Sequence, residues 1–274
     1  MAQLVATELA NGPLIVVASA MSTVTDYLVG ANQAAGQGDF GTVDQKLKAI
    51  RTLHHRAIEA LADDDVAADR KRIIDDLLGQ ALRVLRATAF LRELTPRARD
   101  AVLSVGEKLS IRVLAMAFED VGIEVECIDA DTFLDTDDRF GGANPLGGVG
   151  ERTIRSRLAA NVDAGKVSLI TGFCGRAPDG STTTMGRGGS DLTATTIGAA
   201  MNAEHVTLWS DVDGVFTANP KMVPTARPIG HLNFREAAEM SFYGAKVIHQ
   251  RSMMPVAEKG ISVYSRNTFN PTAV

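Results

Sequence analysis

The 274-residue sequence predicts an α/β fold, a three-layer αβα sandwich with a mostly parallel sheet. Two observations favour this class. Short apolar runs alternate with amphipathic helical segments along the whole chain. Polar or glycine-rich segments follow the apolar runs that end at Ile170 and Trp209. Because ligands of parallel sheets bind beyond the carboxyl ends of the strands, these two segments are where we expect the functional site.

Composition excludes several function classes. Hydrophobic residues make up 45% and charged residues 22%, which is ordinary for a globular protein. The net charge of -5 argues against nucleic-acid binding. The sequence has no apolar run of about 18 residues and no visible secretory signal, so we expect a cytoplasmic protein without a membrane partner.

The cysteines and histidines indicate no redox or metal chemistry. Cys127 and Cys174 are far apart, so we interpret them as small buried apolar residues in or after strands. The histidines lack metal-ligand spacing. We therefore expect no tightly held transition metal.

The N-terminal part predicts a helix, a strand and a second helix. Residues 2–10 favour a helix that Asn11-Gly12-Pro13 breaks, and 14–17 form an apolar run typical of a buried strand. A turn of small residues, 19–26, then leads into a helix. Its hydroxyls and Asp26 could cap that helix or contact a ligand, and capping is the commoner role.

Residues 42–94 predict two packing helices. Apolar residues recur at helical spacing on both sides of an aspartate triplet, 63–65, which we expect to separate the helices and cap the second. The helical positions are Val43, Leu47, Ile50, Leu53, Ile58, Ile74, Leu77, Leu78, Leu82 and Leu85.

Thr95-Pro96 predicts the start of another helix, and Gly106 interrupts its apolar pattern. Such a glycine costs roughly 1 kcal/mol relative to alanine. Either another segment approaches closely there, or a new helix begins at Ser104. Residues 125–128 then predict a strand, and 129–150 a long polar surface connection.

The stretch from Thr171 to Asp191 carries the strongest chemical signal. It follows an apolar run, and its end reads Gly186-Arg187-Gly188-Gly189-Ser190-Asp191 before a predicted helix over 192–203. Glycines let backbone N–H groups approach an anion, a helix N-terminus adds donors, and Arg187 offers a planar fork for carboxylate or phosphate. We expect Ser190 or Asp191 to be the N-cap. The alternative interpretation is a flexible surface loop.

A second loop follows the predicted strand over 206–209. Asp211 and Asp213 precede a glycine as in a calcium loop. We reject that interpretation because Val215 and Met222 stand where oxygen ligands are required. A helix from about Asn233, another helix and a strand over 261–264 complete the prediction.

Several motifs together resemble the aspartate kinases of the amino acid kinase family, and their order and spacing match over nearly the whole chain. The most specific is the run TTTMGRGGSD at 182–191. The others are SAM at 19–21 with VTD at 24–26, GEKLS at 106–110, WSDVDGV at 209–215, EAAEM at 236–240 and YGAKVIH at 243–249. The resemblance implies phosphorylation of the side-chain carboxylate of L-aspartate by MgATP, giving 4-phospho-L-aspartate, the first step toward lysine, threonine and methionine.

The resemblance also implies residue roles. Glu107 would hold the substrate ammonium and Arg187 its carboxylate. The other implied substrate-binding residues are Ser19, Thr25, Gly188, Gly189 and Ser190. Asp191 and Lys246 would be catalytic, Asp191 by organising lysines around the transferred phosphoryl group. The implied ATP-binding residues are Ser210, Asp211, Phe216, Lys221 and Lys246.

In this resemblance the whole chain, 1–274, is one amino acid kinase domain. Residues 1–165 would form mainly the lobe for the amino-acid substrate and 166–274 mainly the nucleotide lobe. ATP and Mg²⁺ are the implied cofactors, with no protein metal-ligand set. The resemblance leaves open whether the chain forms a homo-oligomer.

The sequence departs from the family pattern in places. A KFGGTS-type strand and C-terminal ACT domains are not present, so we expect the first strand of the family sheet to be missing. Phe216 replaces the usual tyrosine, Asn219 an aspartate and Lys221 an arginine. We expect this chain to bind aspartate and nucleotide but to turn over poorly. The alternatives are a non-catalytic partner subunit and a kinase for another acidic amino acid.

Overall fold

The computed structural model describes residues 1–218, 222–242 and 248–271. Its main sheet contains β1 (Ile15–Ala18), β3 (Val167–Thr171) and β2 (Val125–Ile128), in the order β1-β3-β2 and all parallel. A second parallel pair joins β6 (His205–Ser210) to β7 (Ser262–Asn267). In register, Leu169 lies opposite Val16 on one side and Cys127 on the other.

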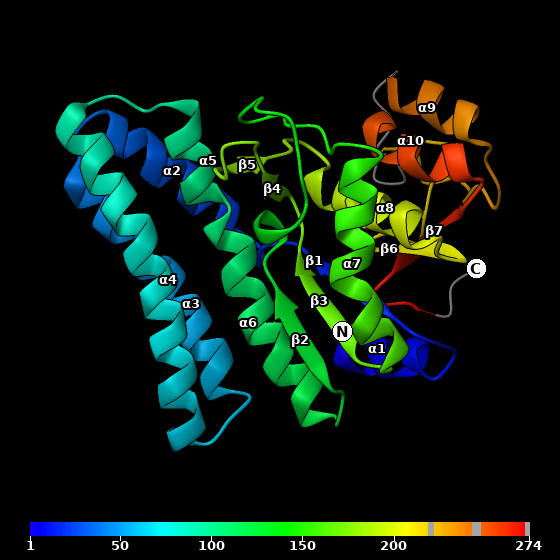
Figure 1. The fold of residues 1–274 in the computed structure, drawn as a ribbon, viewed down its shortest axis with the longest axis horizontal. Coiled ribbons are helices and arrows are strands. Elements are labelled where there is room, and N and C mark those ends of the chain that lie inside the picture. The colour runs from blue at the N-terminus through cyan, green and yellow to red at the C-terminus, as the bar shows by residue number, and fades with distance from the viewer. Residues whose placement is uncertain (219–221, 243–247, 272–274) are drawn as a thin grey trace.

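Helices cover both faces of the main sheet, which gives the three layers (Figure 1). Alternate strand residues point to opposite faces, so each apolar strand supplies two cores. One face packs on α6 (Val105–Asp120) and α1 (Ala2–Leu9), and the other on α7 (Val149–Asp163) and α8 (Gly189–Met201). The strand residues that point toward α6 are Val16, Val125, Cys127, Val167 and Leu169. Those that point toward α7 and α8 are Ile15, Val17, Ile128 and Ile170. The predicted fold class is confirmed.

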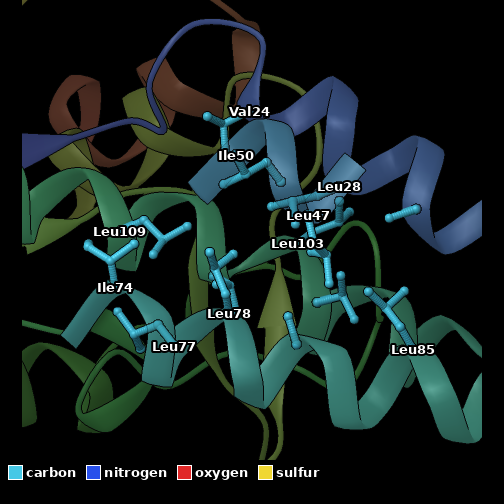
Figure 2. Packing of buried hydrophobic residues seen from close by; sticks show 14 of the residues in the cluster. Val24, Leu28, Leu47, Ile50, Ile74, Leu77, Leu78, Leu85, Leu103 and Leu109 are labelled. Carbon is cyan, nitrogen blue, oxygen red and sulfur yellow. The ribbon is translucent and has the colours of Figure 1, made fainter. Parts of the chain in front are cut away.

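A helical bundle stands beside the sheet and packs against α6 (Figure 1). It consists of α2 (Val24–Gly36), α3 (Phe40–Glu59), α4 (Asp64–Leu91) and α5 (Pro96–Leu103). Figure 2 shows part of its interior, in which the buried aliphatic residues of these helices pack together. The labelled residues are Val24, Leu28, Leu47, Ile50, Ile74, Leu77, Leu78, Leu85, Leu103 and Leu109. The two helices predicted over 42–94 are therefore confirmed as packing elements.

Helix boundaries follow local chemistry in most places. Thr95 caps α5, because its Oγ1 accepts a hydrogen bond from the Ala98 N–H at 3.1 Å. Asp63 occupies the N-cap position of α4, but its side chain makes no capping bond. The aspartate triplet thus separates the helices as expected without the expected cap.

Both explanations for Gly106 hold together. Ser104 separates α5 from α6, so a helix does begin there. A Cβ at Gly106 would also lie 3.1 Å from the Ala20 Cβ and 3.2 Å from the Leu28 Cδ1. The glycine lets the turn after β1 approach the first turn of α6 closely.

The expectation of a surface connection over 129–150 holds only in part, because exposed residues such as Asp138 and Arg139 alternate with buried ones. The segment contains a 3-10 turn, Ala130–Thr132, followed by the buried residues Phe133, Leu134, Thr136 and Ala143. Thr136 Oγ1 bonds Thr183 Oγ1 at 2.6 Å. Distant backbone and side-chain partners satisfy many polar groups of the segment, and local sequence does not reveal them.

Residues 171–191 also differ from the prediction. An antiparallel hairpin, β4 (Cys174–Arg176) with β5 (Thr182–Thr184), precedes the glycine loop. Helix α8 starts at Gly189, and its N-cap is Gly188 in the left-handed region with a φ of 71°. Ser190 and Asp191 therefore lie inside the first turn rather than capping it.

The C-terminal part adds two helices, α9 (Phe234–Phe242) and α10 (Gln250–Lys259). Asn233 begins α9 with a reciprocal capping box, since it exchanges hydrogen bonds of 2.8 and 2.9 Å with Glu236. Both cysteines are free, with Cys174 buried and Cys127 partly buried. Among the described residues, no helix is long and apolar enough to cross a membrane.

Candidate active site

A cavity of about 300 Å³ opens at the carboxyl ends of β1 and β3. Its wall combines the turn after β1, the first turn of α6, the segment after β3 and the start of α8. The lining residues are Ser19, Ala20, Thr25, Glu107, Phe173, Gly186, Gly188, Gly189, Ser190 and Asp191. Seven of the implied substrate-binding or catalytic residues thus lie together, and their roles remain predictions.

Close contact joins the end of β3 to the start of α8. A Cβ at Gly172 would lie 2.6 Å from Ser190 Oγ, so only glycine lets the end of β3 contact α8. Phe173 follows with a positive φ of 67°, uncommon for an aromatic residue. Its N–H donates to Thr193 Oγ1 at 3.1 Å and its C=O accepts from the Met185 N–H at 2.8 Å. Sequence reasoning missed Phe173, because nothing local marks that conformation.

Glu107 supplies a buried carboxyl group to the cavity wall. The residue is 4% exposed, and its Oε1 accepts a long 3.4 Å hydrogen bond from the Ala20 N–H. Oε2 is buried and has no hydrogen-bond partner among the described residues. Burial raises the pKa of this carboxyl to about 8, although the hydrogen bonds oppose the shift. Glu107 is therefore mostly neutral at pH 7 when nothing occupies the cavity.

The neighbouring cation does not compensate Glu107. Lys108 Nζ lies 2.7 Å from Asp131 Oδ2, which also accepts a 2.7 Å bond from Thr182 Oγ1. Burial alone would lower the pKa of Lys108, but the Asp131 carboxylate outweighs it and raises that pKa. The charge of Lys108 is committed to Asp131.

Asp191 is the second carboxyl group of the cavity wall. Burial raises its pKa, and no described side chain donates a hydrogen bond to its carboxylate. It lies in the first turn of α8, where the helix dipole favours negative charge. The wall thus offers two carboxyl groups without described cationic partners.

The remaining implied residues are distributed more widely. Arg187 is exposed and does not line the cavity, although Gly186 and Gly188 on either side of it do. Ser210 ends β6, with exposed Asp211 and half-buried Phe216 beyond it, away from the cavity lining. Lys221 and Lys246, like Asn219, lie outside the described residues.

A match to known families decides the classification. The amino acid kinase family is matched over residues 1–267. This chain belongs to the amino acid kinase family. The family prediction made from the motifs is confirmed.

Similar proteins in this family are aspartokinases. The chain is 36% identical to aspartokinase 3, chloroplastic, of Arabidopsis thaliana, over 94% of this chain and 46% of the relative. It is 31% identical to the lysine-sensitive aspartokinase 3 of Escherichia coli, over 94% of this chain and 56% of the relative. The solved structure of E. coli aspartokinase III with aspartate and ADP superposes with a TM-score of 0.90 at 32% identity, covering 99% of this chain and 58% of that one. The chain spans about half the length of the curated relatives it matches.

In this amino acid kinase the loop before α8 depends on Asp100, which sequence reasoning also missed. Asp100 is fully buried in the middle of α5. Its carboxylate accepts from the Gly141 N–H at 2.7 Å, the Thr184 N–H at 2.7 Å and Thr184 Oγ1 at 2.8 Å. Burial raises the pKa of Asp100, and these three donors partly offset it. One carboxylate thereby joins the bundle, the 129–150 segment and β5.

We expect Asp100→Ala to lower the free energy of unfolding by about 2–3 kcal/mol, because it strands buried backbone donors. Urea unfolding monitored by circular dichroism measures the loss. Asp138→Ala is the matched control, since Asp138 lies exposed on the same polar segment. Equal, small losses in both variants would contradict the role given to Asp100.

Proposed function

We propose that this chain is the kinase domain of an aspartokinase, which phosphorylates the side-chain carboxylate of L-aspartate with ATP to give 4-phospho-L-aspartate. The observation that carries the proposal is the buried, unpaired carboxyl of Glu107 facing the glycine loop across one cavity. A buried acid with an unsatisfied oxygen is completed by a cation that also donates hydrogen bonds. An α-ammonium group meets both requirements.

The amino acid would lie between Glu107 and the glycine loop. Its ammonium would approach the free Oε2 of Glu107, and Arg187 would turn across the cavity mouth to pair with its α-carboxylate. The hydroxyls of Ser19, Thr25 and Ser190, which border the cavity, would donate to its oxygens. The peptide groups of Gly188 and Gly189 leave room for close approach.

Phosphoryl transfer onto a carboxylate makes few demands on the protein. The side chain of aspartate is ionised at neutral pH, so the attack needs no general base. One carboxylate oxygen forms a bond to the γ-phosphorus while the bond to the bridging oxygen breaks, and ADP leaves. The protein must hold the reactants in line and neutralise the phosphate charge.

The proposal for the nucleotide-binding part of the site rests on fewer described residues. Ser210, Asp211 and Phe216 follow β6 and would contact the nucleotide, with Lys221 and Lys246 as the implied phosphate cations. Asp191 fits a cation that accompanies the phosphates, because its carboxylate has no described partner. Asp191 would supply one oxygen ligand to Mg²⁺ that enters with ATP, and the ion would supply positive charge against the phosphates.

Turnover of L-aspartate with MgATP, measured by coupled ADP release, tests the proposal. We expect Arg187→Ala to weaken the binding of L-aspartate at least tenfold, because a lost bidentate ion pair costs about 1.5–3 kcal/mol. The affinity for ADP should change less than twofold. Calorimetry measures both affinities, and Arg139→Ala, an exposed arginine outside the cavity lining, is the control. Binding without turnover would favour a non-catalytic subunit. Equal losses for both ligands would mean that Arg187 contacts phosphate.

We also expect L-aspartate binding to release a proton near neutral pH. In the empty cavity Glu107 is protonated at pH 7, because its pKa is about 8. An ammonium beside it favours the carboxylate and lowers that pKa, so the proton leaves. Calorimetry in buffers of different ionisation enthalpy measures the release. The proton release should shrink well above pH 8 and vanish in Glu107→Gln. A binding enthalpy that does not depend on the buffer at pH 7 would contradict the role of Glu107.

A further inference from the structure

Arg251, in the first turn of α10, holds the glycine loop from the side opposite the bundle. Its Nη1 donates to the Met185 carbonyl at 3.1 Å. Its Nη2 donates to the Ala143 carbonyl at 2.7 Å and to Asn144 Oδ1 at 2.8 Å, with the Gly142 carbonyl at 3.4 Å. The oxygens that Arg251 bonds among the described residues are all uncharged. Three are backbone carbonyls, and the fourth belongs to the side chain of Asn144.

Two neighbours of Arg251 secure the other end of the same loop. Ser252 is buried, and its Oγ donates to the Gly188 carbonyl at 3.2 Å. A Cβ at Gly188 would lie 3.0 Å from the His249 Cβ, so only glycine fits against this turn. Met185 and Gly188 bracket Gly186-Arg187, which means that α10 holds both ends of the loop that carries Arg187.

The chemistry of arginine suits this task. A planar guanidinium presents five donors in fixed directions and accepts none, so it can join several carbonyl oxygens that no single neutral donor reaches. Lysine offers a point charge on a flexible stem and cannot hold Met185 and Ala143 with the same geometry. The contacts lie 66 and 108 residues away in sequence, so they fix tertiary placement rather than local structure.

We propose that Arg251 is a positioning residue for amino-acid recognition, which holds the Gly186–Ser190 loop in its binding conformation from α10. The identity of the amino acid rests on the proposed function, whereas the loop placement does not. Ligand affinity on the glycine loop then depends on a helix that contributes nothing to the cavity wall. Displacement of a positioning group by about 1 Å is enough to cost up to a hundredfold in activity.

The test compares Arg251→Met and Arg251→Lys with Arg235→Met, because Arg235 is an exposed arginine on α9 that pairs with Glu239 at 3.6 Å. Hydrogen exchange followed by mass spectrometry reports on peptides covering 142–144 and 185–190. Calorimetry with L-aspartate and, separately, with ADP reports on binding, and thermal unfolding reports on stability.

We expect Arg251→Met to speed hydrogen exchange in those two peptides and to weaken the binding of L-aspartate roughly tenfold to a hundredfold, while the affinity for ADP stays within twofold. Arg251→Lys should lose an intermediate amount of L-aspartate affinity, and Arg235→Met should lose none. If Arg251→Met does not fold, Arg251→Lys and Ser252→Ala decide by the same readouts.

Unchanged exchange over 185–190 together with aspartate affinity within twofold would overturn the proposal. Parallel losses of aspartate, ADP and thermal stability would overturn it as well, since they indicate a merely structural residue. A third outcome separates the two proposals. If the unsubstituted chain binds no L-aspartate but the Arg251 variants still exchange faster, the placement of the loop by Arg251 is supported and the proposed function is contradicted.

Discussion

The buried carboxyl group of Glu107 is the constraint on which the site depends. An ionised carboxylate would lose its hydration there, and the long hydrogen bond from the Ala20 N–H compensates little of that loss. The group therefore remains protonated, with a pKa of about 8, until a cation arrives. Because the folded chain holds this proton more tightly than the unfolded chain, the contribution of Glu107 to stability falls as pH rises from about 4.5 to 8. A bound ammonium group would relieve that cost.

The rest of the fold serves to place other groups opposite this carboxyl. Parallel strands deliver the ends of β1 and β3 to the same edge, and two glycines, Gly106 and Gly172, let α6 and α8 close on those ends. The loop between β5 and α8 contributes Met185 to the core beneath α8. Asp100 holds the end of β5 from the bundle, through the N–H and Oγ1 of Thr184, and Arg251 holds the Met185 carbonyl from α10. Hydrogen bonds from both sides therefore fix the glycine loop beside the cavity.

Local periodicity and turn chemistry predicted most of the fold. The strand over 125–128 was placed correctly because an apolar run flanked by Gly122 and Asp129 has few alternatives. Residues 129–150 were misjudged in part, because polar, glycine-rich sequence is typical of surface, whereas here distant residues such as Asp100 and Arg251 hold part of the segment against the protein. The start of α8 was placed too late because the left-handed cap at Gly188 depends on packing against His249. The cavity residues were found through motif resemblance, whereas Phe173, Asp100 and Arg251 carry no local signal because their partners are remote in sequence.

The ionisation state of Glu107 in the empty protein tests this account most directly. Infrared spectra of the ligand-free chain, with those of Glu107→Gln subtracted, report on the carbonyl stretch of its protonated carboxyl. We expect that band at pH 7, half lost near a pKa of about 8 and replaced by a carboxylate band above it. A Glu107 that is already ionised at about pH 6, as an ordinary solvated glutamate would be, would contradict the account.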